Sequence, residues 1–465
     1  MTKKRDYFGC ARTHAMGVQS RAKESTTDVT RQRVVTPFFS PAPTHTHMST
    51  ATLASFYTQP WKGRFAEVSK ALDDFMRTTV IPAEPRYYAQ RKANIDKGDA
   101  WSIVPVVEEL KREAQKRGLW NLFLPAASGL TQHEYAQLAE RMGGYPYGVE
   151  AFNCDAPDTG NMETLHLFGT PEQKQKYLVP LLSGTLRSAF CMTEPDVASS
   201  DASNLQMTAT PDGDDYILHG RKWWASGFGH PKCKVLIVMV STAASEHSNV
   251  PPHERHSMFV VDRDTPGISG VRAMQVFGSD DAPHGHFEVL FNKVRVPSAN
   301  ILVGPGKGFH IAQGRLGPGR IHHCMRSIGM AERALSLMVA RAAARTAFRA
   351  ALEKHGMVQE AIAESRIEIE QARLLVLQCA KLIDQGGSRA AVKNISIIKV
   401  DAPRAACRVI DRAIQVHGAM GVSQDTPLAA MYAWQRALRI ADGPDEVHLT
   451  TVAKVEVARQ RRSKL

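Results

Sequence analysis

Residues 190–201 read FCMTEPDVASSD, and they mark the point at which the sequence changes from one structural pattern to another. The stretch begins as a strand and ends as a polar loop dense in Thr, Ser and small residues. Such a loop can place backbone N–H groups and hydroxyls against a planar, polar ring. Before it, apolar residues recur every three or four positions, which predicts helices over 66–75, 104–117 and 132–141. The sequence TPEQ at 170–173 is a further helix start with a capping box.

After this stretch the sequence has a β pattern. Residues 205–224 predict a hairpin around PDGDD at 211–215. Further strands, rich in Val, Ile and Phe, are expected at 235–241, 257–261 and 287–296. Gly and Pro separate these segments, so a β unit of roughly 110 residues is predicted.

Helices return after GPGKG at 304–308. Long Ala-, Leu- and Arg-rich segments predict helices over 320–351, 357–384, 390–416 and 427–440, with a last helix from about residue 445. Pro403 is expected to begin a turn or to kink its helix. Long helices with one apolar stripe form antiparallel bundles. The predicted fold is therefore α+β and multidomain, with an extension at 1–50 that is disordered or serves targeting, a helical domain at 51–187, a β domain at 188–302 and a helical bundle at 303–465.

Composition excludes several classes of protein. The 465 residues are 43% hydrophobic and 22% charged, as in globular proteins. No window approaches about 18 uninterrupted apolar residues, so no membrane span is predicted. The net charge is +12, but Lys and Arg form no run interleaved with aromatics, so an anionic small ligand is favoured over nucleic acid. The seven cysteines are scattered without a C-x-x-C pair, which argues against a disulfide framework and a cysteine zinc site.

Other motifs give weaker signals. The histidines of HHC at 322–324 are adjacent on a predicted helix and so point in different directions, and no metal site is predicted. The GPGKG run matches neither common phosphate loop and is interpreted as a linker. A second cofactor signal is KWWASG at 222–227, where a large aromatic lies beside a hydroxyl at a strand end. This pattern suits the wall of a flat cofactor, although two adjacent tryptophans can also serve core packing.

The stretches 190–201 and 222–227 resemble motifs of the acyl-CoA dehydrogenase family. Two further segments, QVHGAMG at 415–421 and RIADGPDEVH at 439–448, also resemble its motifs, and all four occur in the family's order. The resemblance covers about residues 61–459 and is strongest to the branch of family members 10 and 11. It implies an N-terminal helical domain, a middle β-barrel and a C-terminal four-helix bundle. It also implies FAD between barrel and bundle, in a site that a neighbouring subunit completes.

By the same resemblance, cofactor-binding residues come from all of these motifs. Thr193 would hydrogen-bond the flavin, Trp224 would stack near it, and Arg345 would reach FAD phosphates across a dimer. Without the neighbouring motif, Arg345 would be interpreted as an ordinary surface arginine. The full implied set is Phe190, Met192, Thr193, Ser199, Trp224, Ala225, Ser226, Arg345, Phe348, Gln415, Gly418, Ala419, Pro444 and Glu446.

The resemblance also implies an acyl-CoA site. Its residues would be Ser200, Gly317, Pro318, Gly319, Arg320 and Gly443. The run 317–320 (GPGR) is expected to open the first long bundle helix, where free N–H groups would favour an anion beside Arg320. Commoner relatives have bulkier polar residues before this arginine, so this chain leaves more room there, and its substrate preference stays open.

The implied catalytic residue is Asp442, at the position of the family's usual glutamate base; the branch of members 10 and 11 also carries aspartate there. Aspartate is shorter by one methylene, so its carboxylate reaches less far than that of glutamate. The backbone or the substrate must therefore bring the carboxylate within hydrogen-bond range of the proton. An alternative is that Asp442 caps the last helix, because DGP is followed by two acids. Another branch of the family places its base where this chain has Gly319, which cannot act as one. Pro444 and Glu446 replace the Thr and Gln of many relatives, which makes their cofactor contacts less secure.

Three functions remain open from the sequence. The first is an FAD-dependent acyl-CoA dehydrogenase of fatty-acid β-oxidation, a dimer or dimer of dimers, with electron-transfer flavoprotein or O₂ as acceptor. The second is a flavin oxidase that uses O₂. The third is a catalytically dead acyl-CoA-binding protein on the same fold.

The terminal residues 463–465 read SKL, which is a peroxisomal address read by an import receptor. Residues 1–47 are Arg- and Ser-bearing like a mitochondrial presequence, but they contain acids and lack a clear amphipathic face. A peroxisomal location is predicted first and a mitochondrial one second. Met48 is a candidate start, so residues 1–47 need not belong to the mature protein.

Overall fold

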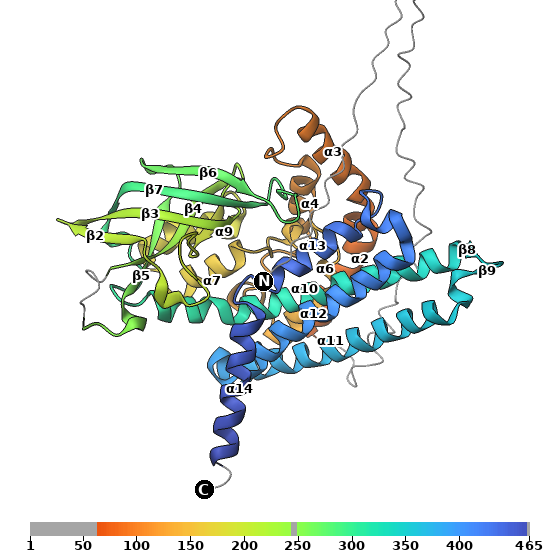
Figure 1. Ribbon diagram of the computed structural model, residues 1–465. Coiled ribbons are helices and arrows are strands. Elements are labelled where there is room, and N and C mark those ends of the chain that lie inside the picture. Colours follow the sequence, from red (N-terminus) through yellow and green to blue (C-terminus); the bar gives the residue numbers. More distant parts are fainter. Residues whose placement is uncertain (1–62, 243–248, 463–465) are drawn as a thin grey trace, which may run out of the picture. The chain divides into compact units, whose positions relative to one another are not determined.

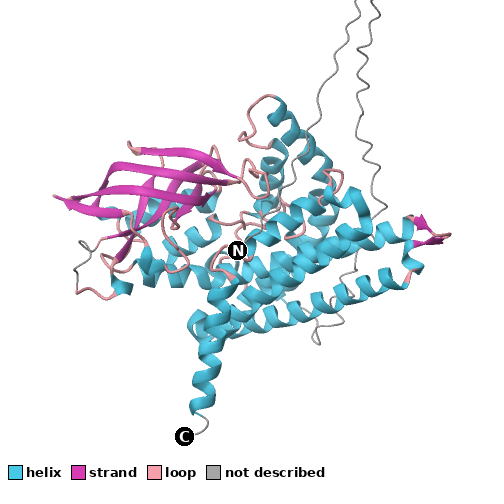
Figure 2. Ribbon diagram, in the orientation of Figure 1, coloured by secondary structure: helices cyan, strands magenta, loops and turns pink. Residues whose placement is uncertain are grey.

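The computed structural model describes residues 63–242 and 249–462 (Figures 1 and 2). Its N-terminal part is helical, as the apolar period predicts. The main helices there are α2 (Gly63–Phe75), α3 (Glu84–Asp96), α4 (Pro105–Lys116), α6 (Gln132–Met142) and α7 (Asp158–Phe168). The predicted capping box is confirmed at α8 (Pro171–Gln173), where Thr170 and Gln173 bond each other's backbone N–H. A second capping box, from Thr131 and Glu134, begins α6.

A seven-stranded sheet follows. Its strands are β1 (Arg187–Cys191), β2 (Thr208–Asp212), β3 (Asp215–Ser226), β4 (Cys233–Ser241), β5 (His256–Asp262), β6 (Ile268–Met274) and β7 (His286–Pro297). The hydrogen-bonded order is β1-β4-β2-β3-β7-β6. Strand β5 lies off this path and pairs with β4. The predicted hairpin forms as β2 and β3. The sequence did not predict β6, because most of its side chains are exposed and leave no apolar signal.

Strand β4 contributes side chains to two hydrophobic cores, one on each face of the sheet. Leu236, Val238 and Val240 pack with Phe259 and Phe291 inside the β domain. The alternate residues Val235, Ile237 and Met239 belong to the large hydrophobic core formed by the helices. Because successive side chains of a strand point to opposite faces, β4 joins the sheet to the helical part of the molecule.

The C-terminal part is a bundle of long helices. They are α10 (Gly308–Ala344), α11 (Gly356–Ala390), α12 (Val392–His417), α13 (Leu428–Leu438) and α14 (Asp445–Arg462). A short hairpin of β8 (Thr346–Ala347) and β9 (Ala350–Ala351) connects α10 to α11. Figure 1 shows α10, α11 and α12 running alongside one another, and α10 contacts both of its neighbours.

Three local expectations about this bundle are wrong. The first long helix begins at Gly308, so Gly317, Pro318, Gly319 and Arg320 lie inside α10 and not at its start. The backbone N–H groups of this run are therefore not those of a helix start and do not favour an anion beside Arg320. The same helix ends at Ala344, before the hairpin. Finally, the turn expected at Pro403 does not form, because α12 continues through that residue; a kink there stays a prediction.

A buried ion cluster joins α6, α10 and α11. Arg373 is 3% exposed, and its guanidinium contacts Glu140 at 2.7 Å and Glu370 at 2.6 Å, and also Glu332. The helices approach closely beside it, since a Cβ on Gly329 would lie 1.9 Å from the carbonyl oxygen of Glu140. The cluster thus fixes the crossing of the N-terminal helices with the bundle.

Two sequence predictions lie outside the described residues. These are the N-terminal extension and the address at Ser463, Lys464 and Leu465, so the peroxisomal location stays a prediction. Among the described residues, no helix is both long and apolar enough to cross a membrane.

Candidate active site

Asp442 lies in the loop between α13 and α14, with left-handed backbone geometry (φ 55°). Its side chain is 24% exposed, and Oδ2 lies 3.2 Å from Nε2 of His323 on α10. The last helix begins at Asp445, as expected. The carboxylate of Asp442 faces α10 and contacts the imidazole of His323. This contact does not support the alternative in which Asp442 caps α14. A strained backbone of this kind persists only where the surrounding structure holds it.

The backbone around Asp442 is held by side chains of three helices. Its carbonyl accepts hydrogen bonds from Arg320 Nε at 3.1 Å and His448 Nε2 at 3.3 Å. The buried Lys399 donates to the carbonyl of Leu438 at 2.6 Å. A Cβ at residue 443 would lie 2.8 Å from the His448 ring, so glycine is required there. Arg320 and Gly443, expected on the substrate side, are thus also parts of the loop that carries Asp442.

The electrostatic surroundings keep Asp442 ionised. Burial by itself raises the pKa of this carboxyl. The hydrogen bond from His323, the charge that this imidazole carries when protonated, and the positive charges of Arg315 and Lys399 lower the pKa by more, and its net value lies well below the ordinary one. Burial lowers the pKa of His323, so its imidazole is neutral near pH 7.

The ends of β1 and β3 bring the two cofactor motifs together. The carbonyl of Thr193 accepts from the N–H of Trp223 at 3.0 Å, and Thr193 Oγ1 donates to the Trp223 carbonyl at 2.8 Å. Trp224 has a left-handed backbone (φ 53°) and an indole that stays 38% exposed. The hydroxyl of Ser226 lies 2.8 Å from Nδ1 of His286. Phe190, Met192 and Ala225 flank these residues on the same strands or in the adjoining loop.

The loop after β1 is held by its own side chains. Ser199 Oγ accepts from the N–H of Glu194 at 2.8 Å, while Ser200 is exposed. Glu194 in turn pairs with the fully buried Lys222 at 2.7 Å, and Lys222 also donates to the carbonyl of Met192. Ser199 therefore shapes the loop, and Ser200 is the more accessible of the two serines.

A buried arginine connects these strand ends with Asp442. Arg315 on α10 is 7% exposed, and its guanidinium lies 3.8 Å from the centroid of the Phe190 ring. Its Nε donates to Oδ1 of Asn161 on α7 at 3.2 Å. Its charge also acts on Asp442. Arg315 could not be predicted from the sequence, because it belongs to no local motif.

The remaining implied cofactor residues lie elsewhere on the bundle. Arg345 follows the last residue of α10, about 45 Å along the helix from Arg315 at 1.5 Å per residue. Phe348, at the tip of the β8–β9 hairpin, is 94% exposed. Figure 1 shows this hairpin far from the sheet, at the other end of α10. Gln415, Gly418 and Ala419 are exposed where α12 ends, and Pro444 and Glu446 adjoin Asp442. One chain therefore does not gather the whole set into a single site.

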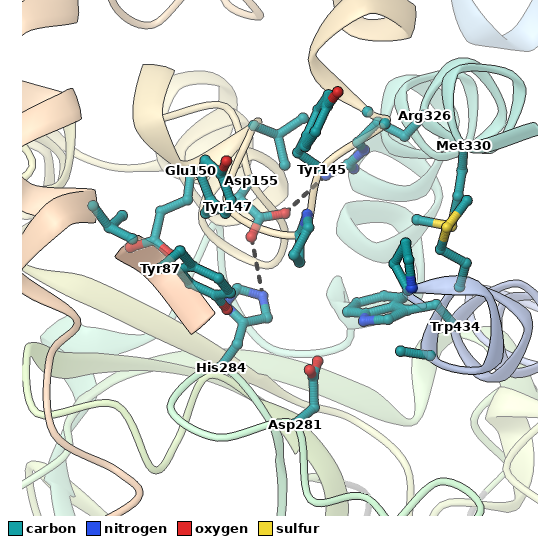
Figure 3. A pocket seen from close by; sticks show the side chains of 18 of the residues that line it. Tyr87, Tyr145, Tyr147, Glu150, Asp155, Asp281, His284, Arg326, Met330 and Trp434 are labelled. Atoms are coloured by element: carbon teal, nitrogen blue, oxygen red, sulfur yellow. Dashed lines mark hydrogen bonds and ion pairs between the residues drawn. The ribbon is translucent and has the colours of Figure 1, made fainter. Parts of the chain in front are cut away.

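A cavity extends from His323 between α3, α10, α13 and the loop before α7. Figure 3 shows Tyr87, Tyr145, Tyr147, Met330 and Trp434 around it. Charged residues form another part of its wall: Asp155 contacts Arg326 at 2.9 Å and His284 at 3.1 Å. The cavity is thus mainly aromatic and apolar, with an ion-pair network along one side.

Three members of this network have metal-ligand chemistry. The ligand atoms of Glu150, Asp155 and His284 lie within 4.8 Å of one another. However, Glu150 contacts Arg187 at 2.5 Å and Lys111 at 2.8 Å, and Asp155 contacts Arg326. Cations already neutralise both carboxylates, so this cluster is an ion-pair network and supports no metal role.

Three family models match the chain in succession. They describe the N-terminal, middle and C-terminal domains of acyl-CoA dehydrogenases, at residues 67–185, 189–294 and 306–456. "Acyl-CoA dehydrogenase family member 11" of Rattus norvegicus is 54% identical over 403 residues, which are 86% of this chain and 51% of that protein. The chain thus spans about half the length of the member 11 proteins that it matches.

Two bacterial proteins match over almost their full length. "Probable acyl-CoA dehydrogenase FadE2" of Mycobacterium tuberculosis is 54% identical over 405 residues, covering 85% of this chain and 98% of that protein. A solved Mycobacterium abscessus structure assigned to the acyl-CoA dehydrogenases is 48% identical, with a TM-score of 0.83. It covers 86% of this chain and 100% of its own. The predicted order of an N-terminal helical domain, a middle β domain and a C-terminal helical domain is confirmed, and the middle domain is a curled sheet.

Proposed function

The chain belongs to the acyl-CoA dehydrogenase family, an oxidoreductase family, and we propose that it uses FAD to dehydrogenate an acyl-CoA thioester between Cα and Cβ. The observation that carries this proposal is the placement of Asp442. An ionised carboxylate lies among positive charges, and its partner His323 lines an apolar cavity. A general base needs this access to the α-proton of its substrate.

The residues at the ends of β1 and β3 fit the flavin of FAD. A half-exposed indole, a hydroxyl from Ser226 and the backbone of the loop at Thr193 can border a flat, polar ring. Arg315, stacked on Phe190, adds a positive charge near the same strand end. When bound, FAD supplies the acceptor for the hydride that leaves Cβ.

The chain's own residues perform the proton transfer. In the proposed reaction Asp442 accepts the proton from Cα, and the electron pair of that C–H bond becomes the new Cα–Cβ double bond as the hydride departs. Negative charge develops on the thioester oxygen during this step, and aimed positive groups stabilise it. Arg315, Arg320 and Lys399 surround Asp442 and supply such a field.

We propose that the acyl chain occupies the cavity lined by Tyr87, Tyr147 and Trp434. Apolar side chains dominate its wall, and burying methylene groups there is favourable by about 0.8 kcal/mol each. Because the cavity reaches His323, an acyl chain in it has its thioester end beside Asp442.

Anaerobic reduction of bound flavin by a panel of acyl-CoAs tests the proposal. Bleaching of the yellow cofactor under nitrogen by at least one member of the panel is the expected result. Stoichiometric peroxide on readmission of air would instead identify a flavin oxidase. A protein that binds acyl-CoA but bleaches with none of them would be a binding protein on this fold.

We also propose that a second copy of the chain completes the cofactor site, as a dimer or a dimer of dimers. The exposed Arg345 and Phe348 and the exposed end of α12 support this proposal, because they lie far along the bundle from the strand ends. Each copy would then lend its β8–β9 hairpin to the FAD of its neighbour.

Arg345→Ala is accordingly expected to weaken FAD retention and assembly together. The change removes a charged donor to phosphate that would be shared between two copies. FAD absorbance per chain and mass in solution, measured on the same sample, are the readouts. Arg349→Ala is the matched control, because Arg349 is also exposed on this hairpin. Full FAD content and unchanged mass in Arg345→Ala would show that Arg345 is only a surface charge.

A further inference from the structure

We propose that His323 is a positioning residue for Asp442, which holds one carboxylate oxygen with its Nε2–H while Arg326 fixes the imidazole tautomer. The inference rests on the proposed role of Asp442 as the base. It adds residues that the sequence motifs do not contain, because His323 belongs to the HHC run for which no metal role is predicted.

The contacts form a chain of four side chains. Asp155 binds Arg326 at 2.9 Å, Arg326 Nη2 lies 3.4 Å from His323 Nδ1, and His323 Nε2 lies 3.2 Å from Asp442 Oδ2. His323 and Arg326 are three residues apart on α10, so they share one face of that helix. His322, on another face, contacts Gln132 instead.

This chain determines which nitrogen of His323 carries the proton. Arginine has only donors, so Nδ1 of His323 can join the contact with Arg326 only as an acceptor. In a neutral imidazole the proton then sits on Nε2, where it is donated to Asp442. Asp155 keeps the Arg326 guanidinium in place for this contact.

The surrounding charges favour a neutral donor over a second cation. Burial and the charges of Arg326 and Lys399 lower the pKa of His323, whereas Asp442 raises it. Asp442 is itself faced by Arg315 and Lys399, and its backbone carbonyl by Arg320 and His448. A protonated His323 would add one more positive charge to this group. The neutral imidazole still donates a hydrogen bond to the carboxylate of Asp442 and adds no further buried positive charge.

Positioning matters here because the base is an aspartate. Its carboxylate extends one methylene less than a glutamate would, and it stands on a strained, left-handed residue between two helices. The bond from His323 fixes Oδ2 and leaves Oδ1 for the α-proton. Misplacement of a reacting group by about 1 Å can cost about 10²-fold in rate.

The test uses three variants of His323 in the FAD-loaded protein. Leucine removes the hydrogen bond, glutamine places an amide N–H near the position of Nε2, and asparagine is too short to reach it. His310→Leu is the matched control, since His310 is exposed on α10 and packs against Phe168. The readouts are FAD content, melting temperature, and the rate constant and the acyl-CoA concentration at half-saturation of anaerobic flavin reduction at pH 7.

Leucine and asparagine are expected to slow flavin reduction about 10²-fold, with little change in the acyl-CoA concentration at half-saturation. A slower rate constant with unchanged half-saturation is what a misplaced base predicts, because acyl-CoA still binds. Glutamine should restore most of the rate, and His310→Leu should match the wild type.

Two results would overturn the inference: unchanged kinetics in His323→Leu, or a slower rate in that variant that glutamine does not restore. Should the leucine variant fail to load FAD, the glutamine–asparagine pair decides by the same criteria. Asp442→Asn separates this inference from the proposed function. If that variant reduces flavin normally, the assignment of the base fails. If it is inactive while His323→Leu is normal, only the role of His323 is overturned.

Discussion

Asp442→Asn is expected to keep its FAD and to lose at least about 10²–10⁴-fold in the rate of flavin reduction by acyl-CoA. The substitution keeps the size of the side chain and removes its basic charge. The contact of the side chain with His323 can persist, because the amide oxygen accepts a hydrogen bond as the carboxylate does. Stopped-flow absorbance under nitrogen, at saturating acyl-CoA, measures the loss.

Asp442→Glu is the comparison that isolates the charge. It retains a carboxylate and extends it by one methylene, so it should reduce flavin faster than Asp442→Asn. Near-normal flavin reduction in the asparagine variant would contradict the assignment of Asp442 as the base. Equal and complete inactivity of both variants, with FAD lost, would point to a structural role for this loop.

Arg373→Met is expected to lower the free energy of unfolding by about 3–5 kcal/mol, as when one partner of a buried ion pair is removed. Arg373 is 3% exposed and faces Glu140, Glu332 and Glu370. Methionine fills much of the volume but leaves these acids facing one another at the crossing of α6, α10 and α11. Denaturant unfolding at pH 7 is the measurement.

Arg408→Met serves as the control for Arg373→Met. Arg408 pairs with Glu368 at 2.8 Å but is 49% exposed, so its loss should cost no more than about 1 kcal/mol. Similar losses in the two variants would contradict the importance of the buried cluster.

The deficit of Arg373→Met should also shrink in acid. Burial raises the pKa of Glu332, but its bonds and charge pairs with Arg366 and Arg373 lower it below the ordinary value. Such a group adds stability above its unfolded pKa of about 4.3 and loses that contribution as pH falls through its lower folded pKa. Wild type therefore loses this advantage in acid, while the unpaired acids of the variant can take up protons.

The order of the domains could be predicted because each has its own apolar period. The start of α10 could not, because Gly314, Gly317, Pro318 and Gly319 favour a turn when taken locally. Long-range packing overrides that preference: Gly314 lies against Phe168, and Gly317 against Ser388 of α11. The mostly exposed β6 lacked the alternation that identifies a strand.

The site was predictable to the extent that it lies in contiguous motifs. Asp442 and the loop at Thr193 could be named from the sequence through resemblance to the family. His323, Arg326 and Arg315 could not, because their significance comes from which face of α10 they occupy. His323 and Arg326 differ by one helical turn and so face the same way, whereas the adjacent His322 contacts Gln132 in the core.

The alternating side chains of β4 have a consequence for how the protein comes apart. Because Val235 and Ile237 belong to the helical core while Leu236 and Val238 belong to the sheet's own core, opening either core exposes apolar surface in the other. The three sequence-defined domains should consequently melt as one cooperative unit, without a populated state in which the sheet alone is lost. In native-state hydrogen exchange, the amides of β4 should exchange only through global unfolding and rank among the slowest in the chain.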